Sequence, residues 1–465
     1  MLVLSVAANG CISARRTPNL EQIFAKARTS TGKRPVIVIP GILGSELINS
    51  KTGEQVWPSA FRTSQEGLPI SPDLEANRDD LIPGKIVATA KLAKLLPEVY
   101  VYRDLLEALR RYAGYREGDW NNPAVDGDQD TFYVFSYDWR RDNVANAREL
   151  VRRMQLLKQK LARPDLKFNI VAHSMGGLIA RYAAMYGDAD LPAGDAAAIQ
   201  PTWLGAAHIG KIVMIGVPNE GSADAFATLI EGYSVTEGLR RRVPLLNKLT
   251  AEDAARTPSV FQLLPHAGVV RFLDENLKPI DVDLYDVENW KRYGWSALHD
   301  PDFRRDVENT DGTNGESSSV DAYLAATLNR ARRFHQALDA ADTASAPVVL
   351  LAIGGDCEET LNAPILLRDA KRNRWLTLTR PREFRTSTGV KISKKTVTDA
   401  MYIPGDGRVT RASLLGENIF KIRDSQTGFT LSRYAVFGCD LHGQLPRNKT
   451  LQDNALTAIA GEVMR

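Results

Sequence analysis

The sequence has few cysteines and histidines and no segment that is plainly built to cross a membrane. It contains three cysteines and six histidines among 465 residues, and the cysteines (Cys11, Cys357 and Cys439) lack the spacing of a metal site. No stretch of 18 apolar residues occurs, so no transmembrane helix is predicted. The formal net charge of +3 is too small to imply a nucleic-acid partner. An internal repeat is also lacking, which argues against a solenoid or propeller.

The residues that are present predict one large α/β domain. With 44% hydrophobic and 25% charged residues, the chain is globular and can bury a large core. Short apolar, β-favouring runs alternate with stretches of helical periodicity. These runs begin near residues 35, 131, 168, 211, 348 and 434. Such alternation predicts a mostly parallel sheet with helices on both faces, whose strand ends and any site share one edge.

The most informative stretch is the turn around Ser174. Phe168 to Val171 form a short apolar run, and an amphipathic helical pattern starts at Met175. A serine at a strand-to-helix turn adopts strained backbone angles, so its neighbours two residues away must be small, as Ala172 and Gly176 are. Its hydroxyl then lies beside a helix N-terminus, where an oxyanion is favoured. The pattern therefore predicts a nucleophile, although a serine that merely caps the helix would look similar.

A serine hydroxyl needs a base, usually a histidine that a carboxylate orients. His442 follows the last predicted strand by a few residues, where the histidine of this fold belongs, and it completes the order Ser, Asp, His. His173 adjoins Ser174 but leaves the backbone in another direction, so we interpret it as structural. The remaining histidines lie in helical, cap or loop segments: His208, His266, His299 and His335.

Two aspartates compete for the role of the acid. Asp356 comes shortly after the strand that ends near Ile353, which is the generic position. Asp406 lies in a glycine-flanked turn just beyond an insertion, and such a turn also occurs without any function. The residues alone leave both candidates open.

Several motifs together resemble the lecithin:cholesterol acyltransferase family of α/β hydrolases, which includes lysosomal phospholipase and phospholipid:diacylglycerol acyltransferases. The segments that carry the resemblance are Val38–Leu47, Tyr137–Arg140, Ala172–Gly177 and Gly405–Val409, followed by His442. They occur in the family's order from about residue 35 to the C-terminus.

The resemblance has consequences for the site. It implies an α/β-hydrolase fold, and it selects Asp406 as the acid, because the family takes its acid from the Gly-Asp-x-x-Val turn. It implies an oxyanion hole formed by the amides of Met175 and Ile42. It also places Trp57 in a flexible lid near the substrate, although ordinary packing would explain a tryptophan there equally well.

We therefore divide the chain into an N-terminal tether or signal-like segment (1–34) and an α/β-hydrolase domain (35–465). Within the domain we expect a lid loop (48–100), a cap insertion (223–300) and a basic hairpin insertion (360–404). Between residues 368 and 395 the last of these has ten Lys and Arg against two acidic residues. Such a patch suits peripheral contact with an anionic membrane, and a solvated hairpin is the equal alternative.

These features predict a serine-dependent acyl hydrolase or O-acyltransferase that acts on lipid esters, such as a phospholipase A or a lipid acyltransferase. No metal or organic cofactor is implied. A soluble carboxylesterase or thioesterase would use the same chemistry, and a catalytically silent lipid-binding protein is the alternative from another class. The sequence does not determine whether the acyl group goes to water or to an alcohol. It also does not determine the head group or the acyl chain of the substrate.

The N-terminus and the cysteines bear on the compartment. Residues 2–11 resemble the end of a secretory signal running into a lipoprotein-like cysteine, which favours export to the cell envelope. A cytoplasmic protein with an ordinary frayed N-terminus is the alternative. Cys357 and Cys439 each follow a predicted strand, so neighbouring parallel strands would bring both sulfurs to one sheet edge. A disulfide there would also fit an oxidising compartment.

Overall fold

A computed structural model describes most of the chain. The described residues are 17–58, 67–75, 78–91, 98–100, 102–193, 199–234, 248–266, 271–310, 318–340, 346–369, 371–419 and 431–460. Residues 2–11, which carry the signal-like pattern, lie outside this set.

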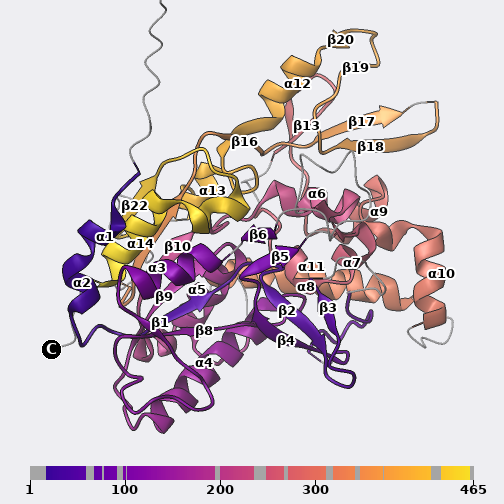
Figure 1. Ribbon diagram of the computed structural model, residues 1–465. Helices are drawn as coiled ribbons and strands as arrows, with labels where there is room; N and C mark the ends of the chain where they lie inside the picture. The colour runs from indigo at the N-terminus through magenta and orange to yellow at the C-terminus, as the bar shows by residue number, and fades with distance from the viewer. Residues whose placement is uncertain are drawn as a thin grey trace, which may run out of the picture.

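A seven-stranded sheet forms the centre of the molecule (Figure 1). Its strand order is β22-β15-β10-β9-β1-β8-β7, and every neighbouring pair is parallel. In chain order the strands are β1 (Val36–Ile39), β7 (Arg116–Glu117), β8 (Thr131–Val134), β9 (Phe168–His173), β10 (Ile209–Ile215), β15 (Val349–Gly354) and β22 (Arg433–Val436). β1 and β9 are buried along their whole length, as a parallel sheet covered on both faces requires.

Helices cover both faces of this sheet. Alternate residues of β1 separate into two hydrophobic clusters, Ile37 and Ile39 in one and Val36 and Val38 in the other, because successive strand side chains point to opposite faces. The first cluster includes residues of α4 (Asn143–Lys160), α5 (Met175–Tyr186) and α11 (Ser318–Leu338). The second includes residues of α1 (Leu20–Ile23), α3 (Arg103–Arg111) and α14 (Lys449–Ala460). The predicted fold class, an α/β hydrolase, is therefore confirmed.

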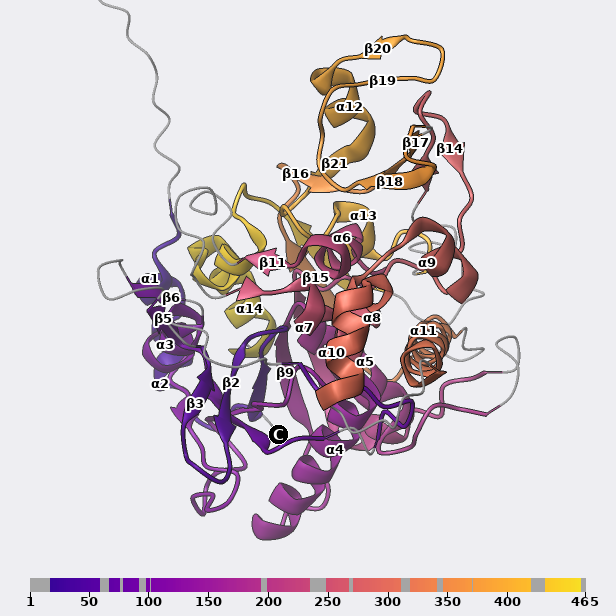
Figure 2. The ribbon, with the colours of Figure 1, turned by 90° about the vertical axis from the view of Figure 1, so that its right-hand side faces the viewer.

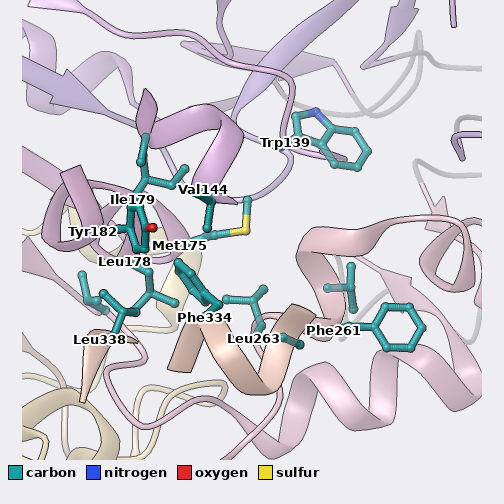
Figure 3. Close-up of a cluster of buried hydrophobic side chains, with 14 of the residues drawn as sticks. Trp139, Val144, Met175, Leu178, Ile179, Tyr182, Phe261, Leu263, Phe334 and Leu338 are labelled. Carbon is teal, nitrogen blue, oxygen red and sulfur yellow. The ribbon is translucent and has the colours of Figure 1, made fainter. Parts of the chain in front are cut away.

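The core continues directly beneath the nucleophile turn. Met175 is fully buried, and Figure 3 shows it among side chains of α4, α5 and α11. The labelled neighbours from those helices are Val144, Leu178, Tyr182 and Phe334. Because Met175 is packed on all sides, the start of helix α5 is held in place, and so is the turn in front of it.

The segment between β1 and α3, predicted as a lid loop, contains two small antiparallel sheets. One is β3-β2-β4, formed by β2 (Ser45–Asn49), β3 (Gln55–Trp57) and β4 (Leu81–Ile86). The other pairs β5 (Thr89–Lys91) with β6 (Glu98–Tyr100). The sequence shows little alternation here because these strands are short and irregular, with register shifts in both pairings of β2.

The predicted cap region is mainly helical. Its elements are α6 (Ala223–Glu231), β11 (Tyr233–Ser234), β12 (Lys248–Leu249), α7 (Ala251–Ala255), α8 (Pro258–Phe261), β13 (Phe272–Leu273), β14 (Pro279–Ile280), α9 (Val287–Tyr293) and η3 (Ala297–His299). Helix α10 (Pro301–Thr310) follows it.

The basic insertion forms a lobe that projects from the body of the molecule (Figures 1 and 2). The lobe consists of β16 (Glu358–Leu361), β17 (Ile365–Asp369), β18 (Arg374–Leu378), β19 (Phe384–Arg385), β20 (Lys391–Ile392), α12 (Lys394–Met401) and β21 (Tyr402–Gly405). β17 and β18 form a hairpin, which β13 and β14 of the cap extend to four strands. The predicted cap and hairpin insertions thus share a sheet.

The described part of the predicted tether packs on the domain. Residues 17–34 contain α1 and α2 (Ala25–Thr29), and the side chains of Leu20 and Phe24 are buried. The buried Lys33 pairs with Asp130, with Nζ and Oδ1 2.6 Å apart. The few apolar residues of this stretch stand among polar and basic ones, so these anchors are easily overlooked in the sequence.

Candidate active site

Ser174 occupies a sharp turn between β9 and α5. Its φ of 54° and ψ of −131° lie in a region that non-glycine residues rarely adopt. The Ser174 amide donates to Ile215 O on β10 at 2.8 Å, which fixes the turn to the sheet. A Cβ at Gly176 would lie 2.4 Å from Pro40 O, so only glycine fits two residues after the serine. The strained turn is held by its surroundings, as in a nucleophile elbow.

His442 and Asp406 complete a hydrogen-bonded chain with Ser174. The distance from His442 Nε2 to Ser174 Oγ is 2.8 Å, and from His442 Nδ1 to Asp406 Oδ2 it is also 2.8 Å. All three residues are buried, with 6%, 8% and 2% of Ser174, His442 and Asp406 exposed. The structure therefore brings together the three residues that the sequence and the resemblance selected.

The hydrogen bonds around Asp406 determine which atoms donate and which accept between Asp406, His442 and Ser174. Its Oδ1 accepts the amides of Arg408 at 3.1 Å and Val409 at 2.8 Å. The remaining oxygen accepts from His442 Nδ1–H, because a carboxylate has no proton to donate. His442 Nε2 is then left as the acceptor for the Ser174 hydroxyl. Asp356, the rival acid, lies just beyond β15, and the carboxylate in contact with His442 is that of Asp406.

The amides of Met175 and Ile42 are predicted to form the oxyanion hole, and both residues lie in segments next to Ser174. Met175 is the first residue of α5, where amides have no partner within the helix. Ile42 belongs to the turn from Gly41 to Gly44, which the Gly44 amide closes on Gly41 O at 3.1 Å. A Cβ on Gly41 would lie 2.7 Å from the Cβ of Ser174, so this turn passes directly beside the serine.

Trp57 lies in the hydrophobic core, with 3% of its surface exposed. Its ring packs edge-on against Trp139 at a centroid distance of 5.7 Å. Its Nε1–H donates to Leu43 O at 2.9 Å, so the side chain supports the turn that contains Ile42. Packing accounts for the tryptophan in this structure. The predicted contribution to a substrate lid stays a prediction, and residues 59–66 lie outside the described part.

Three further side chains border the site, and sequence reasoning missed one of them, Tyr102. Tyr102 contacts both Gly41 and His173, and Tyr137 contacts Pro40. His173 was predicted to be structural, and its Nε2 does bond to the carbonyl oxygen of His442 at 3.1 Å. Burial, and secondarily the neighbouring His442, lowers the pKa of His173 well below its usual value, so the ring is neutral. Tyr137 stands in a motif that carried the resemblance, whereas nothing in the sequence marks Tyr102.

The predicted proximity of Cys357 and Cys439 is confirmed. The two residues form a disulfide with their Cα atoms 5.1 Å apart. Cys357 directly precedes β16, and Cys439 comes three residues before His442. Cys11 lies outside the described residues.

The described part of the chain shows neither a metal site nor a membrane-spanning helix. No group there of three or more His, Cys, Asp or Glu side chains could hold a metal ion. In the same residues, none of the helices combines the length and the apolar character that a membrane span needs.

The comparisons with known proteins support the family resemblance. Residues 94–318 match the family model described as lecithin:cholesterol acyltransferase, which confirms the resemblance inferred from the motifs. The match supports an enzyme that acts on lipid esters, as a hydrolase or an acyltransferase. The matched region contains Ser174, while Asp406 and His442 lie beyond it. No curated protein matches the chain significantly.

One solved structure shares the fold, and two others match with lower scores. The protein solved as the Tle4–Tli4 complex matches with a TM-score of 0.55 and 14% sequence identity, over 94% of this chain and 100% of that chain. EstA from Clostridium botulinum matches with a TM-score of 0.35 and 12% identity, over 94% and 90% of the two chains. Lipase 1 from Pelosinus fermentans matches with a TM-score of 0.33 and 11% identity, over 93% and 100%. At 14% identity, the first match shows a shared fold.

Proposed function

We propose that the protein is a serine acyl hydrolase or O-acyltransferase of the lecithin:cholesterol acyltransferase type, acting on lipid esters through Ser174, His442 and Asp406. The observation that carries the proposal is the buried chain of hydrogen bonds through Ser174, His442 and Asp406. An unreactive serine that merely capped helix α5 would need neither the histidine nor the carboxylate. Ser174 in fact makes no side-chain cap to that helix.

In the proposed reaction, Ser174 Oγ attacks the ester carbonyl carbon while His442 Nε2 takes the hydroxyl proton. The carbonyl electron pair moves onto oxygen, and the amides of Ile42 and Met175 stabilise the resulting oxyanion. When the tetrahedral intermediate collapses, the alcohol leaves with the proton held by His442, and an acyl-enzyme remains. Water or an acceptor alcohol then repeats the sequence, releasing a free acid or a new ester and regenerating the Ser174 hydroxyl. Asp406 holds His442 in the tautomer that both steps require.

We propose a lipid substrate, presented at a surface that the basic lobe recognises. The lobe exposes most of its basic side chains, including those of Arg368, Lys371, Arg382, Lys394 and Lys395. The last strand of the lobe, β21, ends at Gly405, directly before Asp406, so the lobe that carries this charge leads directly into the site. Clustered cations near a surface favour anionic lipids by about 1 kcal/mol each, and salt weakens that attraction. The enzyme should therefore bind anionic vesicles more tightly than zwitterionic ones, and less tightly at high salt.

The test of the nucleophile is labelling with a fluorophosphonate probe. Wild-type protein should be labelled and Ser174→Ala should not, with ester turnover reduced by several orders of magnitude. Ser319→Ala is the control, because Ser319 lies on α11 and its buried Oγ has no hydrogen-bond partner among the described residues. Labelling that persists in Ser174→Ala would overturn the proposal.

Two further measurements separate the alternatives. A soluble carboxylesterase or thioesterase would hydrolyse monomeric esters as fast as micellar ones, whereas a lipid-specific enzyme accelerates when its substrate aggregates. A silent lipid-binding protein would show neither labelling nor turnover. Lipid profiling of mixed liposomes after incubation would then identify the head group, the chain and the acceptor.

We also propose that the enzyme is exported to an oxidising compartment, with the cell envelope as its destination. The disulfide between Cys357 and Cys439 supports this, since such bonds persist mainly outside the reducing cytoplasm. Fractionation of cells that express the full-length protein, followed by immunoblotting, tests the location. Recovery in the cytoplasm with both thiols reduced would contradict it.

A further inference from the structure

The peptide group between Pro40 and Gly41 is hydrogen-bonded to two buried tyrosines, one at its carbonyl oxygen and the other at its N–H. Its carbonyl oxygen accepts from Tyr137 Oη at 2.9 Å, and its N–H donates to Tyr102 Oη at 2.8 Å. Both phenols are 2% exposed. Because both hydrogen-bonding groups of one planar unit are engaged, the plane cannot rotate without breaking a buried hydrogen bond.

The direction of each hydrogen bond follows from the groups involved. The carbonyl oxygen of His442 can only accept, so the neutral ring of His173 carries its proton on Nε2. His173 Nδ1 is then an acceptor, and it lies 2.8 Å from Tyr102 Oη, which must donate. The Tyr102 oxygen thereby keeps a lone pair for the Gly41 amide. Burial raises the pKa of Tyr102 and of Tyr137 far above the usual value, so both phenols retain their protons.

This arrangement determines which amide of the turn is available to a substrate. The Gly41 amide is bound to Tyr102, and the Gly44 amide closes the turn on Gly41 O. Ile42 lies between them, and its N–H belongs to the next peptide unit, whose carbonyl oxygen, Gly41 O, accepts the Gly44 amide. The clamped Pro40–Gly41 peptide on one side and this turn closure on the other together set the direction of the Ile42 N–H. Its side chain plays no part in this, which explains how an apolar residue can stand at the position.

We propose that Tyr102 and Tyr137 are positioning residues for the oxyanion hole, acting through the Pro40–Gly41 peptide to aim the Ile42 amide at the substrate carbonyl. His173 belongs to the same device, because it connects Tyr102 to the backbone of His442. The oxyanion turn, the nucleophile turn and the histidine loop are thereby joined by hydrogen bonds that do not involve the reacting atoms. The proposal rests on the proposed function, since it presupposes an acyl-transfer reaction at Ser174.

The test compares Tyr102→Phe and Tyr137→Phe with a matched control. Tyr133→Phe is the control, because Tyr133 is also fully buried and its hydroxyl donates to a carbonyl, Gly127 O, at 2.9 Å. Losing one oxyanion donor lowers kcat by about 10²–10³. Misdirecting a donor that remains present should cost less, so we expect kcat on a soluble short-chain ester to fall by about 10- to 100-fold in both test variants. KM should stay within about threefold, since the donor acts mainly in the transition state.

A second readout separates positioning from general loosening of the fold. An alkyl boronic acid forms a tetrahedral anion with a reactive serine, so its affinity reports the oxyanion hole rather than ground-state binding. We expect its inhibition constant to rise in Tyr102→Phe and Tyr137→Phe in proportion to the loss of kcat, and to stay unchanged in Tyr133→Phe. An unchanged kcat in both test variants would overturn the proposal. A loss of kcat without weaker boronate binding, or an equal loss in Tyr133→Phe, would do the same.

The outcome remains interpretable in two further cases. If one tyrosine variant does not fold, the other tests the same peptide from its opposite side. If the wild-type protein has no esterase activity and Ser174 is not labelled by a fluorophosphonate, the proposed function fails. A failure of the tyrosine clamp alone would leave wild-type activity and labelling intact.

Discussion

Replacing Asp406 with asparagine tests the acid, and the structure predicts how the new side chain will lie. Asp406 Oδ1 accepts two backbone amides, those of Arg408 and Val409, and an amide NH₂ group cannot accept them. The asparagine oxygen must therefore take that place, which directs its NH₂ at His442 Nδ1. Nδ1 then becomes an acceptor and the proton moves to Nε2, where it blocks transfer from Ser174.

The expected cost is about 10⁴ in kcat, or about 5.5 kcal/mol of transition-state stabilisation, as for the wrong histidine tautomer in the general triad template. Steady-state hydrolysis of a soluble ester measures it, with a thermal melt to show that the isosteric side chain leaves the fold intact. Asp356→Asn is the matched control, since Asp356 lies just beyond β15 but the carboxylate in contact with His442 is that of Asp406. Equal losses in both variants, or a larger loss in Asp356→Asn, would refute the reasoning.

Three other outcomes are expected. Reducing the Cys357–Cys439 disulfide, whose residues are 82 apart in sequence, should lower the free energy of unfolding by up to about 4–5 kcal/mol in the chain-entropy description; denaturant titrations with and without reductant measure this. Burial lowers the pKa of His335 well below its usual value, so below about pH 6.5 the unfolded chain binds a proton that the native protein does not. Stability should therefore fall with decreasing pH by up to about 1.4 kcal/mol per unit from this group, and His335→Leu should flatten the slope in urea titrations between about pH 7 and 5.5. Gly177→Ala should lower the melting temperature, because its Cβ would lie 2.1 Å from Val217 Cγ2 and overpacking of this kind costs about 1–3 kcal/mol.

The sheet and the nucleophile turn could be predicted because their signals are local. Val36–Ile39 and Phe168–His173 are apolar runs of strand length, and both are buried as a parallel sheet demands. Ser174 is marked by small neighbours, and the structure shows the reason at Gly176, where a Cβ would meet Pro40 O at 2.4 Å. In these strands and at this turn, the backbone geometry restricts the residue types at a few neighbouring positions, and that pattern can be recognised in the sequence.

The supporting roles of Tyr102 and Trp57 could not be predicted, because they depend on long-range contacts. Tyr102 lies 61 positions from Gly41 and 71 from His173. Its only local signal is a place at the start of an amphipathic helix, which predicts a buried aromatic and no more. The resemblance predicts Trp57 in a lid, whereas in the folded chain its indole N–H contacts Leu43 O, 14 residues away.

The competition between Asp356 and Asp406 has a structural explanation. The chain leaves the sheet at the end of β15, builds the basic lobe, and returns along β21, which pairs antiparallel with β16 from Glu358↔Gly405 to Leu361↔Tyr402. This pairing closes the excursion and brings Asp406 back to the place where a short loop after β15 would have put an acid. A Cβ on Gly355 would lie 3.5 Å from the Cβ of Asp406. Closing a longer loop costs little extra entropy, so the lobe could be inserted here without moving the carboxylate from His442. Asp356 is nearer than Asp406 to β15 along the sequence, which makes it the generic candidate for the acid. In the folded chain, the carboxylate that contacts His442 is that of Asp406.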